Sequence, residues 1–341
     1  MPHVDAPPAM NDKAAPANPF TIVRDGDNDV GTLHGAVVAI GNFDGLHRGH
    51  RTVIEAARAQ ASALGRKAAA LTFTPHPRRF FRPQEAHFQL SSERDRLRLL
   101  AATGLDGAIV MTFDAALAST SAQDFIEKIL VGRFGIGGAA IGFDFHFGKD
   151  RQGSPAYLAG QGAELGFVVD IVPPLQDEGR PVSSGAVRSA LSEGKVVEAA
   201  ELLGAPWFMS GEVIHGDKRG RELGFPTANI RPAPGCGLKH GIYAIRAGIA
   251  GQRYDGVASF GVRPMFDDGA ALLEVFLFDF DGDLYGKTVD VAFIGWIRHE
   301  QKFSSIDALK RNMMADVSQA RLSLKRAGKD AFPALSDVEG V

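Results

Sequence analysis

The stretch AVVAIGNFDGLHRGH, residues 36–50, decides the fold of the first half of the chain. Residues 36–40 form a continuous apolar run, which is typical of a strand buried on both faces in a parallel sheet. The run ends at Gly41, and apolar residues then recur at helical spacing over residues 48–64. A strand, a glycine-containing turn and a helix in direct succession predict a ligand site at the carboxyl end of the strand.

The turn and the start of the helix carry groups that suit a phosphate. Free backbone N–H groups and the positive end of the helix dipole attract anions at this position. His47 and His50 are three residues apart, so they share one side of the first turn and can both donate to phosphoryl oxygens. Gly49 lets a phosphate approach the backbone between them. The pattern suits attack on the α-phosphate of ATP. Two histidines and three glycines at one strand–helix junction make a pair of surface histidines the weaker alternative. A zinc site is also weaker, because no second helix carries matching ligands.

Strands and helices alternate through the rest of the first half. This alternation predicts a parallel sheet covered on both faces by helices. The last helix would bridge the two halves of the chain, with residues 204–206 as the joint. The strands are expected at 68–73, 108–112, 139–142 and 167–172, and the helices at 92–102, from about Ser121 onward, and at 184–203.

The second half has a different pattern, because strand-like segments follow one another without helices between them. Such a pattern predicts an antiparallel sheet or a small barrel, followed by one helix at about 306–321. We expect a disordered tail at 1–19, a first domain at 20–204, a second domain at 205–325 and a polar tail at 326–341. The expected strands lie at 211–215, 241–250, 253–260, 271–280 and 288–297.

Composition excludes several classes of protein. The 341 residues include 37 Lys and Arg against 40 Asp and Glu, so there is no basic excess for nucleic acid or an anionic membrane. Residues 1–19 lack the pattern of a signal peptide, and no apolar run is long enough to span a bilayer. The one cysteine, Cys236, cannot form an internal disulfide. We expect a cytoplasmic protein, and the sequence leaves a homo-oligomer open.

A second phosphate site is predicted at residues 216–229, which read GDKRGRELGFPTAN. The glycines allow close approach of a phosphate, and the basic residues between them can offset its charge. Thr227 and Asn229 are two residues apart, so on an extended chain they face the same way. Two oxygen ligands on one face suit Mg²⁺ that bridges nucleotide phosphates. The alternative is a solvated basic loop followed by a polar edge strand.

Glu274 is a carboxylate on an otherwise apolar strand face. Strand alternation places it on the same face as Leu272, Phe276 and Phe278, where a charged group needs a reason. Partial burial would raise its pKa and make it a better proton acceptor. The alternative is a structural ion pair with an arginine such as Arg246.

Four segments of the first half resemble one known family. Residues 41–50 resemble the HxGH signature of the nucleotidylyltransferase superfamily, in the form found in bacterial bifunctional riboflavin kinase/FMN adenylyltransferases (FAD synthetases). Residues 71–77 are similar to the TFxPHP segment of that family, and residues 141–149 to its GxDFxFG loop. Residues 181–188 resemble its SSTxxR motif, in which Gly185 stands here in place of the usual threonine.

The second half resembles the same family. Residues 224–229, GFPTAN, resemble the PTAN signature of riboflavin kinases, and residues 297–303 resemble the IRxExKF segment. Residues 259–266 resemble a further family stretch, which usually has a threonine where this chain has Met265.

The resemblance implies a fold and an activity. The fold is an α/β Rossmann-like nucleotidylyltransferase domain with a parallel sheet, followed by an antiparallel β-barrel riboflavin kinase domain with a terminal helix. The activity is ATP-dependent phosphorylation of riboflavin to FMN and adenylylation of FMN to FAD with release of pyrophosphate. Mg²⁺ is the implied cofactor, ATP the co-substrate, and riboflavin, FMN and FAD the other small-molecule partners.

The resemblance also implies roles for individual residues. Glu274 is the base of the kinase, and His47, His50 and Arg188 stabilise charge in adenylyl transfer. Thr227 and Asn229 hold the metal. The sequence leaves the residues that stack on the flavin open, and we name Phe147 and Phe225 as candidates. The residues implied in nucleotide or flavin binding are Gly41, Phe43, Asp44, Gly45, Gly49, Asp144, Phe147, Gly148, Ser183, Ser184, Gly216, Lys218, Arg221, Gly224 and Pro226.

Three alternatives remain at this stage. The first is a kinase whose adenylyltransferase half has decayed, with Gly185 as the mark of the loss. The second is an adenylyl- or cytidylyltransferase that acts on a non-flavin substrate, although such an enzyme needs no kinase barrel. The third is a non-catalytic flavin-binding regulator.

Overall fold

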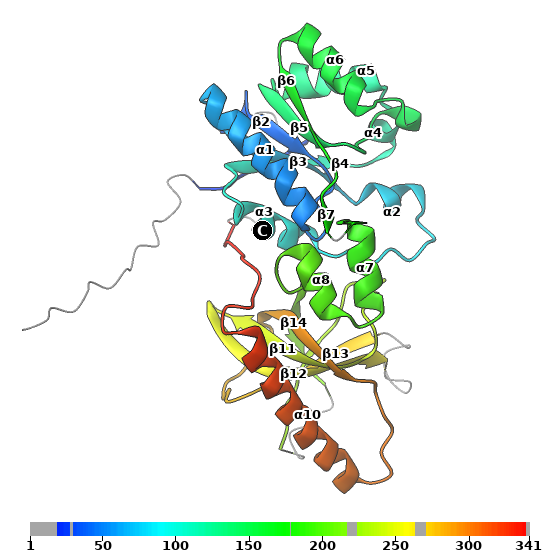
Figure 1. The fold of residues 1–341 in the computed structure, drawn as a ribbon, viewed down its shortest axis with the longest axis vertical. Coiled ribbons are helices and arrows are strands. Elements are labelled where there is room, and N and C mark those ends of the chain that lie inside the picture. Colours follow the sequence, from blue (N-terminus) through cyan, green and yellow to red (C-terminus); the bar gives the residue numbers. More distant parts are fainter. Residues whose placement is uncertain (1–18, 28–29, 178, 217–223, 263–270, 339–341) are drawn as a thin grey trace, which may run out of the picture.

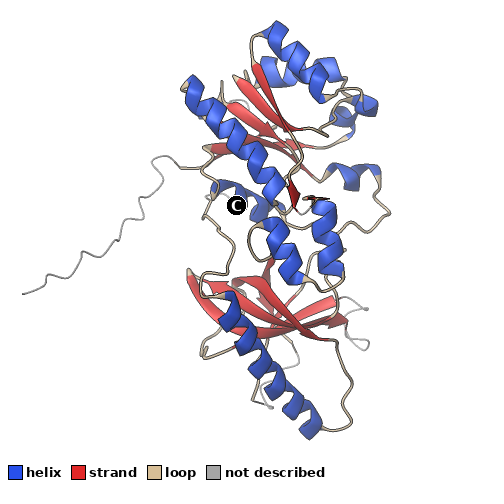
Figure 2. Ribbon diagram, in the orientation of Figure 1, coloured by secondary structure: helices blue, strands red, loops and turns tan. Residues whose placement is uncertain are grey.

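The computed structural model describes residues 19–27, 30–177, 179–216, 224–262 and 271–338. A parallel-sheet domain and a barrel domain are stacked along the long axis of the molecule, and two short helices lie between them (Figure 1). Figure 2 shows that helices flank the sheet of the first domain, whereas the second domain is mainly strands. The two folds expected from the sequence are therefore confirmed.

The first domain is built on a six-stranded parallel sheet in the order β1-β4-β3-β2-β5-β6. Strand β1 was not predicted; it pairs with β4 at the edge of the sheet, where Thr21 is the register partner of Gly107. The strand order reverses at β2, which lies between β3 and β5: β3 and β4 follow on one side of it, and β5 and β6 on the other. The strands are β1 Thr21–Arg24, β2 Val37–Ile40, β3 Ala68–Thr74, β4 Gly107–Thr112, β5 Gly138–Gly142 and β6 Val168–Val172.

Strand β2 is apolar throughout because both faces of the sheet are covered. All four of its residues are buried, and alternate side chains enter different hydrophobic clusters. Val37 and Ala39 join the cluster that contains the inner face of α1, Arg48–Leu64. Val38 and Ile40 join the cluster on the other face, which contains residues of the π-helix Phe125–Arg133. Burial on both faces is the reason why the run shows no polar alternation.

The other helices of the first domain begin and end at recognisable signals. Ser92 and Ser121 accept hydrogen bonds from the N–H groups of Asp95 and Asp124, as expected for N-caps. Gly65 ends α1 in the left-handed conformation at φ 61°. The helical elements are η1 Gly31–Leu33, α2 Pro77–Phe81, α3 Glu93–Ala101, α4 Ala115–Ser119, α5 Ala122–Asp124, η3 Lys149–Arg151 and α6 Pro155–Leu165.

The prediction of one bridging helix at 184–203 is wrong. The segment forms two helices, α7 Ser184–Ser192 and α8 Val196–Leu203. Gly194 separates them with φ 82°, which a non-glycine residue rarely adopts. A Cβ atom at this position would also lie 2.8 Å from the Trp296 ring of the barrel. Both the backbone conformation between the two helices and the close packing against the second domain thus require glycine at this position.

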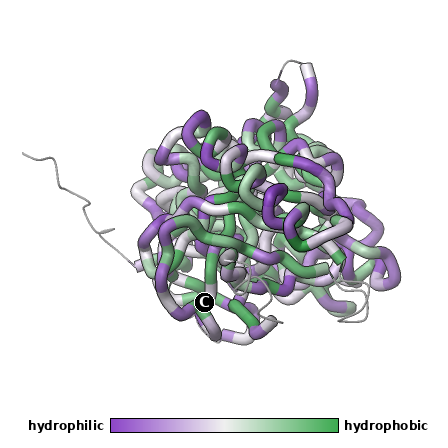
Figure 3. The backbone as a smooth tube through the Cα atoms, turned by 90° about the horizontal axis from the view of Figure 1, so that it is seen from below, coloured by the Kyte–Doolittle hydropathy of each residue, from purple (hydrophilic) through white to green (hydrophobic). Residues whose placement is uncertain are grey.

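The second domain is a closed barrel with the strand order β10-β13-β12-β11-β14-β9, in which every neighbouring pair is antiparallel. Its interior is filled by apolar side chains such as Val213, Ile245, Leu273 and Phe293. The strands are β9 Phe208–Ile214, β10 Ala228–Ile230, β11 Gly241–Ile249, β12 Gln252–Val262, β13 Ala271–Leu277 and β14 Thr288–Arg298. Seen from below in Figure 3, hydrophilic segments form most of the outer loops.

The C-terminal segment returns to the first domain. Helix α10, Ile306–Ala327, packs on the barrel and is longer than the predicted helix. Residues 329–338 then run toward α3 (Figure 1), where the Ser336 N–H donates to the Arg98 carbonyl over 3.3 Å. Phe332 packs partly buried in the same apolar cluster as α10. The described part of the expected polar tail is thus held against the protein.

Polar contacts also join the two domains directly. Arg98 of α3 donates two hydrogen bonds, 2.8 and 2.7 Å long, to the carboxylate of Asp290 in β14. The Ser210 hydroxyl of β9 lies 2.7 Å from the Asp95 carboxylate and 2.6 Å from that of Asp290. These side chains are largely buried, so the contacts fix how the domains meet.

Candidate functional site

A cavity of about 1070 Å³ opens at the carboxyl edge of the parallel sheet. It lies at β2, where the strand order reverses, which is the usual position of ligands in an open α/β sheet. Its volume is at the upper end of the range of about 300–1000 Å³ for sites that hold one small molecule, so two substrates can meet there. The predicted residues that line it are Gly41, Phe43, Asp44, His47, Gly49, His50, Asp144, Phe147, Gly148, Ser183, Ser184 and Arg188.

His47 and His50 form a stacked pair at the start of α1. Their ring centroids are 3.6 Å apart, and the Nδ1 atom of His47 accepts a hydrogen bond of 3.2 Å from the His50 N–H. His47 is therefore the N-cap of α1, and its Nε2 carries the proton when the ring is neutral. The Nδ1 atom of His50 is buried without a partner among the described residues. The alternative of two surface histidines is excluded.

Both rings are neutral at neutral pH. Burial lowers the pKa of His47 to about 4, although the charge of Asp44 opposes the shift. Burial also lowers the pKa of His50 well below its usual value, with further contributions from His47 and Arg188. A neutral imidazole can still donate one N–H to a phosphoryl oxygen, and it does so without the cost of burying another charge.

Asp44 is buried, with 1% of its surface exposed, and is fully engaged. Its Oδ1 accepts hydrogen bonds from the N–H groups of Leu90 and Ser91, 2.9 and 3.0 Å long, and its Oδ2 accepts one from Arg188. The Nε of Arg188 donates to the Phe88 carbonyl over 2.6 Å. Arg188 is thus no simple surface residue: two partners hold its side chain at the wall of the cavity.

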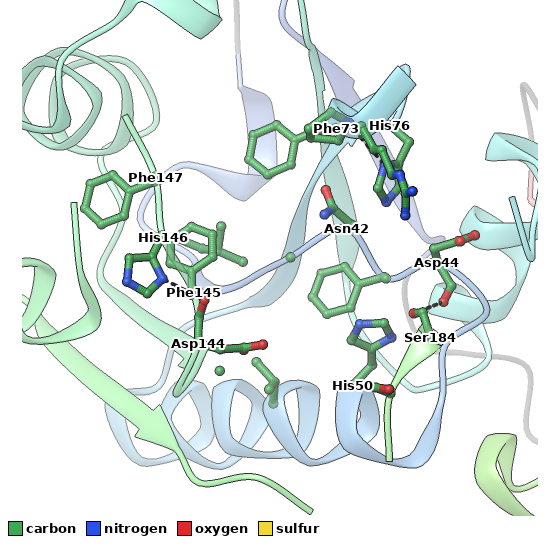
Figure 4. Close-up of a pocket in the computed structure, with 18 of the residues that line it drawn as sticks. Asn42, Asp44, His50, Phe73, His76, Asp144, Phe145, His146, Phe147 and Ser184 are labelled. Carbon is green, nitrogen blue, oxygen red and sulfur yellow. Dashed lines mark hydrogen bonds between the residues drawn. The ribbon is translucent and has the colours of Figure 1, made fainter. Parts of the chain in front are cut away.

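The two serines at the start of α7 have different roles in the structure. Ser183 is the N-cap, because its hydroxyl accepts a hydrogen bond from the Ala186 N–H over 3.2 Å. Ser184 donates to the Asp44 carbonyl over 2.9 Å (Figure 4). A Cβ atom at Gly185 would meet only the Ser183 hydroxyl, at 3.6 Å, so the missing threonine leaves open space.

The loop after β5 forms the opposite side of the cavity, with Asp144, His146 and Phe147 (Figure 4). Phe147 is 8% exposed and its ring packs on Phe145, while a Cβ atom at Gly153 would lie 2.6 Å from it. The ring that was considered for flavin stacking therefore packs within the protein. Gly148 has φ 72°, and a Cβ atom there would collide with the backbone of Ala122.

Two aromatic residues at the cavity are more exposed than Phe147. Phe143 is 51% exposed and Phe81 is 64% exposed. Phe81 also makes an edge contact with Phe113, at a centroid distance of 5.6 Å. Sequence reasoning missed both residues, because a phenylalanine in an apolar segment does not indicate whether it will be exposed.

His76 and Arg96 are further residues that sequence reasoning did not assign to the site. Burial lowers the pKa of His76 to about 4, and its ring lines the cavity. Arg96 is 1% exposed and donates to the carbonyls of Asn42 and Phe73, which ties the loop after β2 to the end of β3. The motif around His76 was a signal for it, whereas Arg96 lies in an ordinary helical pattern.

Asp44, His76 and His87 have the chemistry of metal ligands, and one ligand atom of each lies within 4.8 Å of the others. Both oxygens of Asp44 are already engaged by N–H groups and by Arg188, however. Arg96 adds a second positive charge nearby. The surroundings favour an anion over a cation, and we assign no metal to this cluster.

Two of the residues predicted for the second site lie opposite each other on the barrel. Asn229 in β10 and Glu274 in β13 are direct register partners, and Glu274 is also the register partner of Ser259 in β12. Opposed residues of antiparallel strands share a face, so these three side chains lie in one row. Asn229 is 5% exposed, and its Oδ1 has no partner among the described residues. A Cβ atom at Gly216 would lie 2.3 Å from the Asn229 amide nitrogen, so this glycine makes room for the side chain.

Other groups surround this row. Thr227 is half-buried directly before β10, and the Phe225 ring contacts that of Phe276 at 5.2 Å. Burial raises the pKa of Glu300, and the charge of Glu274 contributes in the same direction. Arg246, the suggested structural partner of Glu274, forms its ion pair with Asp255.

Three residues named in the sequence analysis are not described by the structure, and one residue predicted for the first site does not line its cavity. Lys218, Arg221 and Met265 fall outside the described residues. Gly224 is exposed in a turn with φ 85°, followed by the exposed Pro226. Gly45 does not line the cavity: its N–H donates to the Ser91 hydroxyl, and it adopts φ 77° in the turn before α1.

Two stacked histidines at a helix N-terminus beside an arginine form an arrangement that suits a nucleotide phosphate, and the barrel carries a carboxylate opposite a buried amide. Comparisons with known proteins identify the family. Residues 30–186 match the family model described as FAD synthetase, and residues 203–324 match the one described as riboflavin kinase. A helix long and apolar enough to cross a membrane is not found among the described residues.

Similar proteins span nearly the whole chain. The bifunctional riboflavin kinase/FMN adenylyltransferase of Pseudomonas fluorescens is 41% identical over 288 residues, which cover 84% of this chain and 92% of that protein. The protein of the same description from Haemophilus influenzae is 39% identical, over 88% of this chain and 98% of its own length. A crystal structure of a macrolide-efflux protein from Streptococcus pneumoniae has a TM-score of 0.78 and 32% identity, over 88% of this chain and 98% of that chain.

The chain belongs to the family of bifunctional riboflavin kinase/FMN adenylyltransferases. It is a transferase that phosphorylates riboflavin to FMN and adenylylates FMN to FAD, with ATP as the co-substrate. Both activities of the family are represented by a matched domain, which argues against a kinase without an adenylyltransferase, a transferase for a non-flavin substrate and a non-catalytic regulator.

The burial of His47 predicts a loss of stability in acid. Because its pKa is about 4 in the folded protein and about 6.5 when unfolded, the unfolded chain binds the proton more strongly as the pH falls from about 6.5 toward about 4. This linkage removes about 2 kcal/mol of unfolding free energy between pH 7 and pH 5. His47→Asn keeps an N-cap without a titrating ring, so urea unfolding of this variant should depend less on pH. An unchanged difference between the two pH values would contradict the assignment.

Proposed function

We propose that His47, His50 and Arg188 stabilise the charge that develops on the α-phosphate of ATP during adenylyl transfer. The observation that carries this proposal is the stacked neutral pair of histidines at the N-terminus of α1, beside Arg188 in the same cavity. The phosphate of FMN attacks the α-phosphate, and pyrophosphate leaves. Because the phosphate nucleophile is already ionised, the step needs positioning and charge stabilisation rather than a base.

The remaining residues of the cavity bind the two substrates in this proposal. Gly41, Gly49 and Gly148 allow close approach of the nucleotide, and the α7 N-terminus at Ser183 and Ser184 supplies N–H groups for phosphate oxygens. Phe43, Asp44, Gly45, Asp144 and Phe147 shape the walls and turns around them.

We place the isoalloxazine ring of the flavin against Phe81 or Phe143. These rings are exposed at the cavity, whereas Phe147 is buried among other aromatic rings. Flat aromatic surfaces bind a fused ring through stacking and burial of apolar area.

In the barrel, Thr227 and Asn229 would hold Mg²⁺. The buried Oδ1 of Asn229 fits this role, because a buried oxygen without a partner needs a ligand to satisfy it. The ion, when bound, neutralises charge on the nucleotide phosphates. Glu274, directly across from Asn229, accepts the proton of the riboflavin 5′-hydroxyl as that oxygen attacks the γ-phosphate. Phe225, Gly216, Lys218, Arg221, Gly224 and Pro226 belong to the surrounding flavin and nucleotide loops.

We further propose the boundaries 20–204 and 205–325 for the two domains. ATP, which both reactions consume, is abundant in the cytoplasm, where we place the protein. The net charge of −3 supports the absence of a nucleic-acid partner.

Glu274→Gln should abolish FMN formation and spare FAD formation. The variant keeps the size of the side chain but removes the proton acceptor, which should lower the rate of riboflavin phosphorylation by about 10²–10⁴-fold. FMN and ATP should still yield FAD at the rate of the unaltered protein. Glu212→Gln, an exposed position on the same barrel, is the matched control and should change neither rate. A Glu274→Gln protein that still phosphorylates riboflavin normally would refute the assignment of the base.

His50→Ala should have the opposite effect. Loss of one preorganised donor should lower the rate of FAD formation from FMN by about 10²–10³-fold, while phosphorylation of riboflavin continues. His34→Ala is the control, because His34 is exposed at the amino end of β2, away from the cavity. Chromatographic separation of FMN and FAD measures both steps in one sample, and equal FAD formation by His50→Ala and the unaltered protein would count against the proposed site.

A further inference from the structure

Residues 87–91, which we call the strap, lie between the adenylyltransferase cavity and the kinase barrel. On the cavity side, the strap holds both members of the Asp44–Arg188 ion pair. The Phe88 carbonyl accepts from Arg188, and the N–H groups of Leu90 and Ser91 donate to Asp44. The backbone of the strap thus determines where the Arg188 guanidinium lies.

On the barrel side, the strap is held by Trp207. The indole Nε1 donates a hydrogen bond of 2.8 Å to the Leu90 carbonyl, and the Trp207 ring meets the Phe88 ring edge-on at 5.6 Å. Leu90 is 2% exposed and belongs to the same hydrophobic cluster as the interior of the barrel. The strap is therefore a segment of the first domain that packs against the second domain at the junction between them.

Two glycines of the second domain allow this close packing. A Cβ atom at Gly235 would lie 3.1 Å from the His87 carbonyl oxygen, and one at Gly237 would lie 2.9 Å from the Phe88 ring. These glycines flank Cys236, which is partly buried in the same cluster.

Trp207 is itself firmly positioned by the barrel. It is 4% exposed, and its ring stacks on Phe293 at 5.2 Å. The Trp207 carbonyl also accepts a hydrogen bond of 2.9 Å from the Phe293 N–H. Trp207 therefore contacts β14 of the barrel through its ring and its carbonyl, and it contacts the strap through its indole N–H.

We propose that Trp207 is a positioning residue for adenylyl transfer, by which the kinase barrel holds the strap and so aims Arg188 into the cavity of the other domain. This inference rests on the charge-stabilising role proposed above for Arg188. An arginine side chain has several rotatable bonds, and holding it in one geometry before the reaction avoids an entropic cost during it. A displacement of about 1 Å in such a group can lower a rate by about 10²-fold.

The test is the Trp207→Phe variant. Phenylalanine keeps a ring against Phe293 but removes the indole N–H, so the Leu90 carbonyl loses its donor. The kcat of FAD formation from FMN should fall about tenfold, with little change in the KM for FMN and with riboflavin phosphorylation unchanged. Tyr243→Phe is the matched control: it removes a hydrogen bond to the Lys239 carbonyl in the same barrel and should leave both steps unchanged.

The fluorescence of Trp207 gives a second readout, which does not depend on whether the Trp207→Phe variant folds. The chain has two tryptophans, so Trp296→Phe leaves Trp207 as the one fluorophore of this type. Addition of pyrophosphate, a product of the adenylyl step, should change the emission of Trp207. The change should disappear when Arg188→Ala is added, because the contact to the strap is then lost. A change that persists without Arg188, or no change at all, overturns the proposal.

The outcomes separate this inference from the proposed function. If Arg188→Ala forms FAD normally, the proposed role of Arg188 is wrong. If Arg188→Ala is impaired but a folded Trp207→Phe protein is not, Trp207 is not a positioning residue. A Trp207→Phe protein that loses both activities equally would show that the tryptophan supports the fold as a whole, and it would also overturn the inference.

Discussion

The buried ion pair of Asp44 and Arg188 connects the parts of the adenylyltransferase site. Asp44 follows β2, Arg188 lies on α7, and the strap binds both of them through its backbone. A buried charge pair is favourable only when its remaining hydrogen-bonding capacity is satisfied, and here two N–H groups and a carbonyl complete it. Removal of either partner would leave a buried charge, so the loop, the helix and the strap keep their arrangement together.

In the proposed mechanism, the two sites differ because their nucleophiles differ. The phosphate of FMN is already ionised, and the first cavity accordingly contains neutral donors and arginine, with its buried carboxylate engaged in a structural pair. The riboflavin hydroxyl must lose a proton as it attacks, and the barrel places Glu274 directly opposite Asn229. The chemistry proposed for each nucleophile thus agrees with the charged groups found at its site.

Local patterns predicted much of this arrangement. The run at β2, the two histidines at the start of α1, and Asn229 and Glu274 as separate candidates were found because strand and helix periodicities fix which side chains share a face. The pairing of Asn229 with Glu274 across two strands came from the structure. Edge strand β1 and the break at Gly194 were missed, because they depend on contacts with β4 and with Trp296. The strap and Trp207 were missed for the same reason: their partners lie about a hundred residues away in the sequence, and no local pattern encodes such a contact.

The central claim is that one chain performs a phosphoryl transfer and an adenylyl transfer at separate sites, with FMN as the product of one and the substrate of the other. Mixing the Glu274→Gln and His50→Ala proteins with riboflavin and ATP tests it most directly. Each variant alone should form no FAD from riboflavin, whereas the mixture should form it after a lag in which FMN accumulates. A mixture that forms FMN but no FAD, although the Glu274→Gln protein converts added FMN, would contradict the account.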